Sequence, residues 1–516
     1  MRPIAPWLLA LLGGLLSAPA VAQPPAGDER QAAADLELIS ALERVVARAI
    51  ERSERSVVSI ARKAKAPDYT ADSHPFPNLS SERGQISHDP RSPDFVASGF
   101  ATGVVLDRSG LVLTNHHVLG EDPEENEIFV TTSSRNVFRM RVKASDERSD
   151  LAVLTPLQPG AARGGDFIPI EFGDAATLRK GQIVIALGNP YAIARDGQVS
   201  ASWGIVSNLG RKAIGPRPIT MAPKEKTLHE LGTLIQTDAK LNLGTSGGAL
   251  INLRGEMVGL TTSLAATAGF EQAAGYAIPI DKAFLRIIDK LKEGREVEYG
   301  LLGIVPGDLP LGSLHGGPAR TKVDQVSAFS PAAKARIQRD DLVTHVDGQP
   351  IFDADGLRLH VGRLPPDAVT TLTIVRNGQT SQRRVALTKF PTSLTQIVTE
   401  RPASWRGVHV DYLSAVLLRQ GRELLPFGAG PDYGALARGG VAARDVEEGT
   451  PAWQAGLRRG AIISHVGKTP VETPEDFRRA VADIEGQVEL RLIDEQGRSQ
   501  TVSVPAAADG PPEKVP

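Results

Sequence analysis

Short apolar runs separated by turn residues dominate residues 57–291. Each run is long enough for a strand and too short for an ordinary helix, and glycine, proline or small polar residues bound it. The runs are Ser56–Ile60, Ala101–Asp107, Leu111–Thr114, Ile128–Thr132, Leu151–Leu154 and Ile183–Leu187. Many short strands with this punctuation predict an all-β barrel or a pair of packed sheets.

The N-terminus has a different pattern. Arg2 precedes an apolar run from Trp7 to Leu16, and an Ala-x-Ala motif follows within Ala18–Gln23. This order is typical of a signal peptide, and the run is shorter than the ~20 residues that span a bilayer. We therefore expect residues 1–22 to be removed on export, to a periplasm or out of the cell. A retained membrane anchor is the alternative.

Residues 23–56 are predicted to form a helical segment. Leu38, Leu42, Val45 and Ala49 recur at helical spacing and predict one buried face, packed on its own domain or in an oligomer. From residue 63 to residue 93 the chain is polar and rich in proline, which predicts a long loop that is either functional or disordered.

The last part of the chain contains an internal repeat. Ser330–Ile337 is matched by Thr450–Leu457, and Leu342–Val346 is matched by Ile462–Val466 at the same offset. A repeat of this size predicts two small domains of one fold.

Composition narrows the class of protein. A length of 516 residues predicts about three domains. The net charge of −2, without a basic stripe, argues against nucleic acid as a partner. The chain has no cysteine, which excludes disulfides and thiolate metal sites, and it lacks the HExxH, EF-hand and P-loop motifs. We therefore expect no metal ion and no cofactor.

Three separated motifs carry the chemistry of a nucleophilic serine. Gly244–Gly248 contains Ser246, Thr114–Val118 contains two adjacent histidines, and Ser149–Val153 contains Asp150. A serine hydroxyl needs a histidine to take its proton, and that histidine needs a carboxylate to hold it. The order His, Asp, Ser is that of chymotrypsin-like enzymes, whereas α/β-hydrolases place the serine first. The motifs therefore predict a serine endopeptidase.

Residues 57–291 resemble the HtrA (DegP-like) family of the chymotrypsin superfamily. The resemblance rests on motifs that occur in the family's order: Ala101–Asp107, Leu113–Val118, Asp146–Val153, Ala186–Pro190, Gly204–Ser207, Ile235–Ala239 and Gly275–Pro279. It implies a mainly β fold, in which a chymotrypsin-like double β-barrel protease domain is followed by two PDZ-like α+β domains.

The family pattern implies a catalytic triad of His117, Asp150 and Ser246. It places the catalytic histidine directly before a valine, which selects His117 over its neighbour. Among the other acidic residues, Asp146 lies in a charged turn where we expect it to be solvated. Asp238 is expected to order local backbone.

The resemblance also implies an oxyanion hole made of the backbone N–H groups of Gly244 and Ser246, with Thr245 as a further donor. Thr245 and Leu243 stand where the family usually has asparagine and proline, which changes the stiffness of this loop. The implied walls of the substrate pocket, suited to apolar side chains, are Leu241, Leu260 and Leu264.

Each repeat resembles a PDZ domain, which adds a peptide C-terminus as a strand and holds its carboxylate with backbone N–H groups. The implied carboxylate-binding loops are Leu301, Leu302, Gly303 and Ile304 in the first copy and Gly407 and Val408 in the second. We predict a protease domain at 57–291, PDZ domains at 297–391 and 402–506, and a disordered tail at 507–516.

These observations predict an exported, ATP-independent serine endopeptidase that cleaves misfolded or specific proteins, with PDZ domains that bind C-terminal peptides. The family implies a homo-oligomer built on trimers, although residues 23–67 lack the aromatic residues that commonly make the trimer contact. The alternative is an inactive or conditionally active chaperone or peptide-binding scaffold, which Leu243 and Thr245 keep open.

Overall fold

The computed structural model describes residues 26–65, 89, 91–92, 95, 97–158, 160, 165–189, 197–212, 225–262, 274–309, 321–328, 330–419, 439–494 and 498–506. The predicted signal peptide, most of the 63–93 loop, Leu264 and the predicted tail lie outside these ranges. The chain divides into two units, residues 1–48 and 49–516. Helix α1 (Ala26–Ser53) begins in the first unit and ends in the second. None of the helices in the described ranges is both long and apolar enough to cross a membrane.

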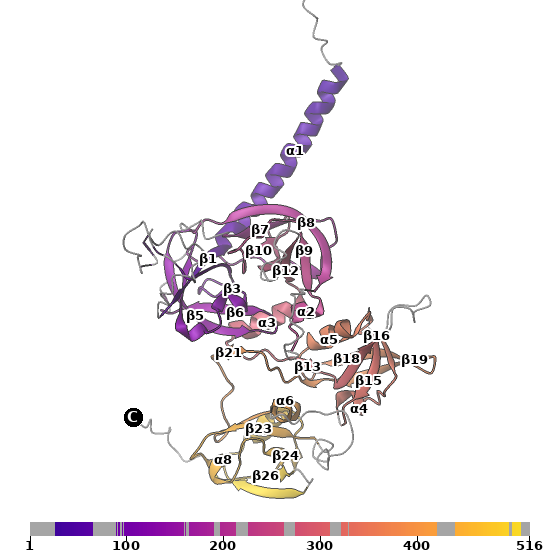
Figure 1. The fold of residues 1–516 in the computed structure, drawn as a ribbon. Helices are drawn as coiled ribbons and strands as arrows, with labels where there is room; N and C mark the ends of the chain where they lie inside the picture. The colour runs from indigo at the N-terminus through magenta and orange to yellow at the C-terminus, as the bar shows by residue number, and fades with distance from the viewer. Residues whose placement is uncertain are drawn as a thin grey trace, which may run out of the picture. The chain divides into compact units, whose positions relative to one another are not determined.

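Strands β1 to β6 close into the first barrel (Figure 1). The strand order is β5-β4-β1-β2-β3-β6, and pairing between β5 and β6 closes the ring. Apolar side chains such as Val58, Ile60 and Val112 fill its interior. The bounds are β1 (Val57–Ala64), β2 (Gly99–Val105), β3 (Val112–Thr114), β4 (Asn126–Thr131), β5 (Val137–Asp146) and β6 (Leu151–Pro156).

Strands β7 to β12 close into the second barrel, in the order β10-β11-β12-β9-β8-β7. Helix α2 (Leu228–Leu231) precedes β9, and helix α3 (Lys282–Lys292) follows the barrel. The Asp281 carboxylate caps α3 by accepting hydrogen bonds from the N–H groups of Ala283 and Phe284. The bounds are β7 (Ile183–Gly188), β8 (Ser200–Arg211), β9 (Leu234–Thr237), β10 (Ala249–Ile251), β11 (Met257–Thr262) and β12 (Gly275–Pro279).

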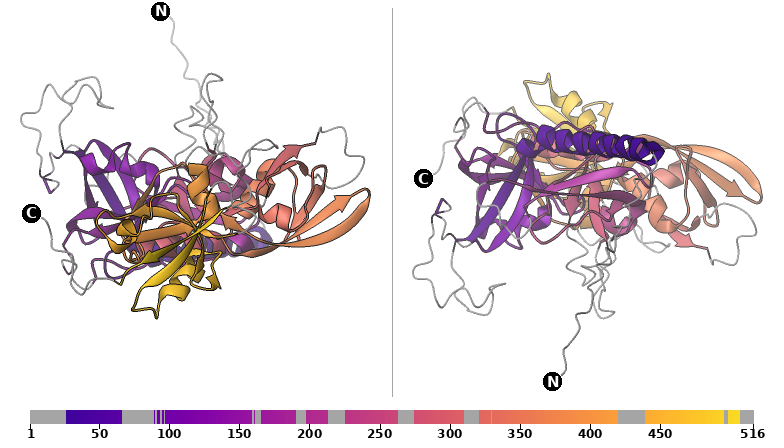
Figure 2. Two further views of the ribbon diagram at one scale, coloured as in Figure 1. Left: turned by 90° about the horizontal axis from the view of Figure 1, so that it is seen from below. Right: turned by 90° about the horizontal axis from the view of Figure 1, so that it is seen from above.

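The two repeats form sheets of matching strand order. The first sheet runs β14-β15-β16-β18-β19 and the second runs β22-β23-β24-β26-β27. The hairpin of β18 and β19 projects from its sheet (Figure 2). The first copy contains β14 (Ile304–Asp308), β15 (Thr321–Val326), α4 (Pro331–Lys334), β16 (Leu342–Val346), β17 (Gln349–Pro350), α5 (Ala354–Gly362), β18 (Val369–Arg376) and β19 (Gln379–Ala386). The second contains β22 (Val408–Tyr412), α6 (Leu413–Arg419), β23 (Val441–Val446), α8 (Pro451–Gln454), β24 (Ile462–Val466), β25 (Thr469–Pro470), α9 (Pro474–Val481), β26 (Val488–Ile493) and β27 (Ser499–Val504). The predicted fold class, two barrels followed by two PDZ-like domains, is confirmed.

The connections between these parts also form strands. Strand β13 (Gly300–Leu301) pairs with β20 (Thr388–Lys389), so the first and last residues of the first PDZ domain lie side by side. Strand β21 (Gln396–Val398), between the two PDZ domains, pairs with β5 of the first barrel. The sequence patterns did not predict this pairing.

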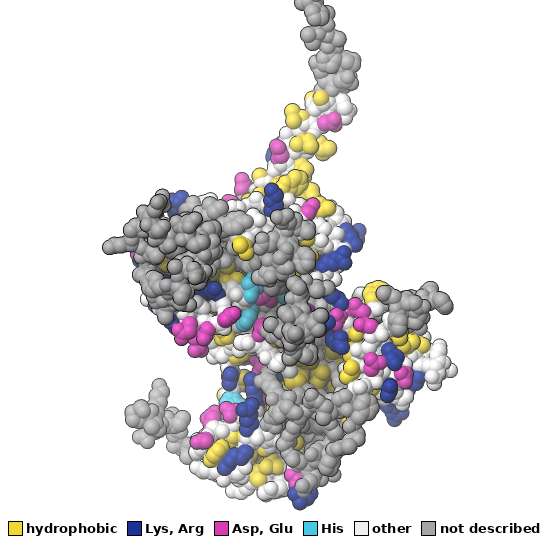
Figure 3. Space-filling view, viewed as in Figure 1, with side chains coloured by type: hydrophobic (Ala, Val, Ile, Leu, Met, Phe, Trp, Pro, Cys, Tyr) yellow, Lys and Arg dark blue, Asp and Glu magenta, His cyan; other side chains and the backbone are white. Residues whose placement is uncertain are grey.

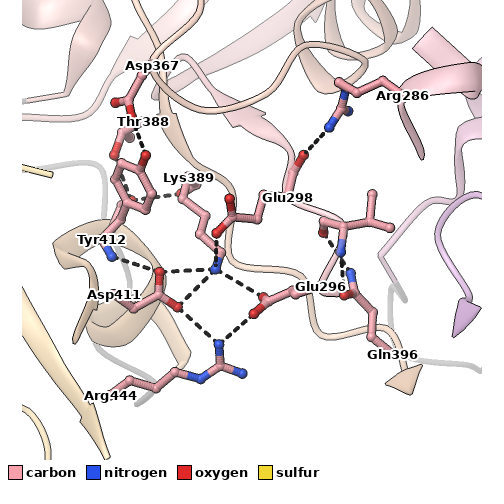
Figure 4. Close-up of polar contacts among 12 residues, drawn as sticks. Arg286, Glu296, Glu298, Asp367, Thr388, Lys389, Gln396, Asp411, Tyr412 and Arg444 are labelled. Carbon is pink, nitrogen blue, oxygen red and sulfur yellow. Dashed lines mark hydrogen bonds and ion pairs between the residues drawn. The ribbon is translucent and has the colours of Figure 1, made fainter. Parts of the chain in front are cut away.

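A buried cluster of charges joins the two PDZ domains (Figure 4). The side chain of Lys389 is only 3% exposed, and its Nζ lies 3.1 Å from Glu296, 2.8 Å from Glu298 and 3.0 Å from Asp411. Arg444 of β23 contacts two of the same carboxylates, Glu296 at 2.6 Å and Asp411 at 3.4 Å. Lys389 comes from the end of the first domain and Asp411 from the second, so the cluster fastens one to the other.

Candidate active site

The two adjacent histidines follow β3, in a 3-10 helix that spans His116–Leu119. His117 Nδ1 lies 3.0 and 2.9 Å from the two carboxylate oxygens of Asp150, and the His117 backbone N–H donates to Asp150 at 3.0 Å. Histidine and acidic side chains lie next to each other on the surface of this domain (Figure 3). The structure therefore pairs the predicted histidine with the predicted carboxylate.

Asp150 is the last residue of the turn that leads into β6, and it is 5% exposed. Its backbone carbonyl accepts hydrogen bonds from the His116 N–H at 3.0 Å and from the Asn115 side chain at 3.2 Å. These bonds fasten the aspartate to the segment that carries the histidine. Because the Asp150 backbone is bonded to the two residues before His117, the Asp150 carboxylate is held close to the His117 ring.

The two side chains shift each other's proton affinity. Burial raises the pKa of Asp150, but the charge and hydrogen bond of His117 outweigh burial and lower it. Burial lowers the pKa of His117, but the charge and hydrogen bond of Asp150 outweigh burial and raise it above 6.5. This is the electrostatic arrangement of a histidine that can hold a proton during catalysis.

The serine loop, residues 242–248, belongs to the second barrel but rests on the first. The Thr102 N–H donates to the Ser246 carbonyl at 2.8 Å, and the Thr102 hydroxyl donates to the Gly244 carbonyl at 2.7 Å. Gly247 has a φ of +83°, and a Cβ there would lie 2.1 Å from the Thr102 carbonyl oxygen and 2.3 Å from the Thr114 hydroxyl. Only glycine fits this contact, which brings the residue after Ser246 against the strand that leads to His117.

The predicted oxyanion donors are not equivalent. The Thr245 N–H donates to the Asn242 carbonyl at 3.1 Å, and the Thr245 hydroxyl donates to the same oxygen at 2.7 Å. The Thr245 N–H is therefore used inside the loop, which corrects the prediction that it is a further oxyanion donor. Gly244 has a φ of +92°, a conformation that glycine adopts without strain.

The other candidates near the site have mixed outcomes. Asp238 accepts a hydrogen bond from the Ile205 N–H at 2.7 Å, so it orders local backbone as predicted. Asp146 is fully buried, and the prediction that it is solvated is wrong. Leu241 packs against the core of the second barrel, and Leu260 is fully buried. The position of neither residue identifies a substrate pocket. Leu264 lies outside the described residues.

The two predicted carboxylate-binding loops are built alike. In the first copy, the Leu302 carbonyl accepts from the Ala332 N–H at 3.0 Å, and Gly303 has a φ of +80°. In the second copy, the Arg406 carbonyl accepts from the Ala452 N–H at 3.1 Å, and Gly407 has a φ of +88°. Leu301 belongs to β13, whereas Ile304 and Val408 begin the edge strands β14 and β22. Each loop thus leads into an edge strand, and a peptide that pairs with such a strand extends the sheet.

Some supporting residues were not singled out by the sequence analysis. His229 is fully buried, and its Nε2 lies 2.8 Å from the Ser149 carbonyl, directly before Asp150. Arg148, Ser149 and Asp146 belong to the motif that identified Asp150, yet only Asp150 received a role there. Because these three residues lie in the same motif as Asp150, the motif was the sequence signal that could have identified them as supporting residues.

Comparison with known proteins agrees with this geometry. Residues 101–260 match the model of a trypsin-like peptidase domain, and residues 300–387 and 443–494 match models of PDZ domains. A probable periplasmic serine endoprotease, DegP-like, from Pseudomonas putida (strain W619) is 30% identical over 481 residues, which cover 88% of this chain and 91% of that protein. The periplasmic pH-dependent serine endoprotease DegQ of Escherichia coli (strain K12) is 28% identical over 409 residues, covering 78% of this chain and 80% of that protein.

Among solved structures, the HtrA-type protease AlgW with a decapeptide is 25% identical, with a TM-score of 0.45, and the match covers 67% of this chain and 99% of that one. The assignment rests on the sequence relatives, since the Pseudomonas putida protein is 30% identical and the match covers 88% of this chain. The chain belongs to the DegP-like (HtrA) family of serine endoproteases.

Proposed function

We propose that this chain is an exported, periplasmic, ATP-independent endopeptidase that uses His117, Asp150 and Ser246 to cleave misfolded or specific proteins. The observation that carries the proposal is the His117–Asp150 pair, because His117 directly follows β3 and the Ser246 loop packs against Thr114 of that strand. The relatives' names, periplasmic serine endoproteases, support the compartment and the reaction. The PDZ loops support binding of peptide C-termini as added strands.

The proposed mechanism assigns one role to each group. His117 accepts the proton of the Ser246 hydroxyl through Nε2 as Oγ attacks the peptide carbonyl, while Asp150 accepts a hydrogen bond from Nδ1–H and fixes the tautomer. The N–H groups of Gly244 and Ser246 donate to the oxyanion. His117 then protonates the leaving amine, and water hydrolyses the acyl-enzyme.

A fluorophosphonate probe together with casein tests this proposal. The mature protein is expected to hydrolyse casein and to gain one phosphonyl group on the Ser246 Oγ, with loss of fluoride, because only an activated serine displaces fluoride readily. Mass spectrometry of tryptic peptides locates the label. A label on another serine would contradict the assignment of Ser246.

The conditionally active alternative has one observation in its favour, since the Thr245 N–H is bonded to Asn242 inside the oxyanion loop. C-terminal peptides added for the PDZ domains distinguish the alternatives. Labelling that requires the peptides would identify a conditionally active protease. Neither labelling nor hydrolysis, with and without peptides, would support the scaffold function.

The rate of labelling is expected to rise with pH as His117 loses its proton. Only the neutral imidazole accepts the serine proton, so activity is present above the pKa of His117 and is lost as pH falls through it. Because Asp150 raises this pKa, the midpoint should lie above the ordinary value of 6.5. Labelling rates between about pH 5 and 9 measure it, and in Asp150→Asn the midpoint should move to lower pH. A wild-type midpoint below the ordinary value would refute the role given to Asp150.

A further inference from the structure

The turn Asp146–Asp150, which leads into the proposed catalytic aspartate, is held by several distant parts of the chain. Asp150 has a φ of +53°, a left-handed conformation that costs energy in a non-glycine residue, so the turn needs support from outside. The supporting bonds are Glu147 N–H to Thr395 O at 2.9 Å, Leu228 N–H to Arg148 O at 2.9 Å, His229 Nε2–H to Ser149 O at 2.8 Å and His116 N–H to Asp150 O at 3.0 Å. Because unpartnered buried backbone groups are costly, these bonds select one conformation of the turn.

Asp146 is the last residue of β5 and the first of this turn, and it has no exposed surface. Its Oδ2 accepts hydrogen bonds from the Ser149 N–H at 2.8 Å and the Ser149 hydroxyl at 2.6 Å, and a third from the Tyr299 hydroxyl. Burial raises the pKa of Asp146, and the hydrogen bonds from Ser149 and Tyr299 oppose that shift. One carboxylate thus ties the residue before Asp150 to a tyrosine that lies beyond both barrels in the sequence.

Tyr299 is itself fixed by the ends of the first PDZ domain. Its carbonyl accepts the Phe390 N–H at 2.7 Å, and its ring is fully buried. The Arg148 guanidinium lies 5.0 Å from the ring centre of Tyr299 and 4.2 Å from that of Phe390, and it pairs with Glu225. Cation–π contacts of this kind, shielded from water, hold Arg148 between the two rings.

Strand β21 supports the same turn from the other side. Gln396, Ile397 and Val398 pair with residues 146, 145 and 144 at the end of β5, on the edge that β4 leaves open. The segment before the first PDZ domain and the segment after it therefore both end on the turn.

We propose that Tyr299 and Asp146 are positioning residues for Asp150, so that the aim of the catalytic carboxylate depends on the segments that join the protease barrels to the PDZ domains. The inference rests on the proposed function, because it takes Asp150 as a member of the triad. The Tyr299 hydroxyl holds Asp146, Asp146 holds Ser149, and Ser149 sets the direction of Asp150. Loss of the first bond lets the turn relax from its left-handed conformation and lengthens the Asp150–His117 contact.

The test replaces Tyr299 with phenylalanine, which removes the hydroxyl and keeps the ring beside Arg148. Tyr412→Phe is the matched control, because the Tyr412 hydroxyl also bonds a carboxylate, that of Asp367, in a part of the chain away from this turn. For the full mature chain, kcat and KM for a peptide substrate, the thermal midpoint and the pH profile of kcat are measured. Titration of His117 is followed by NMR of histidine-labelled protein, a readout that does not require activity.

In Tyr299→Phe we expect kcat to fall on the order of tenfold with KM unchanged, within the range that misplaced catalytic groups produce. The pH midpoint and the His117 titration should both move to lower pH, because Asp150 stabilises the imidazolium less. Ser149→Ala should give a smaller change in the same direction, and Tyr412→Phe should leave kcat and both midpoints unchanged.

A lower thermal midpoint alone, with wild-type kcat and an unshifted His117 titration in Tyr299→Phe and Ser149→Ala, would overturn the inference while the proposed function stands. If the wild-type protein hydrolyses nothing, the proposed function fails. The His117 titration then still decides, because an unshifted titration in both variants rejects the positioning role.

Discussion

Alanine at position 246 is expected to lower the rate of peptide hydrolysis by a factor on the order of 10⁶, the loss typical of removing the nucleophile of a serine protease. The backbone that holds the loop should survive, because the Thr102 N–H bonds the Ser246 carbonyl and not its side chain. Casein hydrolysis at high enzyme concentration measures the residual rate. Circular dichroism and the thermal midpoint check that the variant is folded.

The neighbouring histidines provide a matched pair of controls. His117→Ala should lose nearly as much activity as Ser246→Ala, and the double variant should lose no more, because the groups of a triad act as a unit. His116→Ala should keep most of its activity, since His116 bonds Asp150 through its backbone N–H, whereas His117 donates to the Asp150 carboxylate through its ring Nδ1–H. Activity that survives in His117→Ala and disappears in His116→Ala would reverse the assignment.

The residues of the proposed triad could be predicted from sequence because each lies in a short motif whose chemistry is local. Ser246 sits among glycines that its loop requires, and Gly247 meets Thr102 and Thr114 where only a hydrogen fits. The repeat was visible for the same reason, since the turn that begins α4 reappears before α8 with a Ser or Thr cap. Local patterns of this kind survive without knowledge of the tertiary structure.

Features that depend on distant segments could not be predicted. Asp146 lies in a charged stretch of sequence, yet it is buried and its carboxylate accepts a hydrogen bond from the distant Tyr299 hydroxyl. Strand β21 has three residues, too few for a pattern, and its pairing with β5 is set by the fold. Strand β5 contains no uninterrupted apolar run, because its apolar residues alternate with basic ones, so the apolar runs in the sequence did not predict it.

The second large effect is expected at Lys389, far from the catalytic chemistry. Lys389→Met should lower the free energy of unfolding by about 3–5 kcal/mol, the usual cost of removing one partner from a buried ion pair. Methionine fits the space but leaves Glu296, Glu298 and Asp411 around a site without its central cation. Arg444 still contacts two of these carboxylates, which limits the loss.

Urea unfolding of the full mature chain, followed by tryptophan fluorescence, measures this change. Trp405 packs edge-on against Phe477 and Trp453 lies under Arg458, so both report on the second PDZ domain. Lys389→Arg, which keeps the charge, should lose less than the methionine variant. Adding Asp411→Asn to Lys389→Met should recover part of the loss, because one repelling charge is removed. A methionine variant as stable as wild type would show that the cost of burying the charges equals their attraction.

The pH dependence of this cluster follows from Glu296. Burial raises its pKa, but Lys389 and Arg444 outweigh burial and lower it from 4.5 to about 2. A carboxylate with a lowered pKa stabilises the folded state above its unfolded pKa, and this contribution is lost as pH falls from about 4.5 toward 2. Without Lys389 the pKa of Glu296 should rise, so the methionine variant should lose less stability on acidification than wild type does. A flatter slope of stability against pH in the variant would therefore separate an electrostatic role of Lys389 from simple loss of packing, which has no reason to depend on pH.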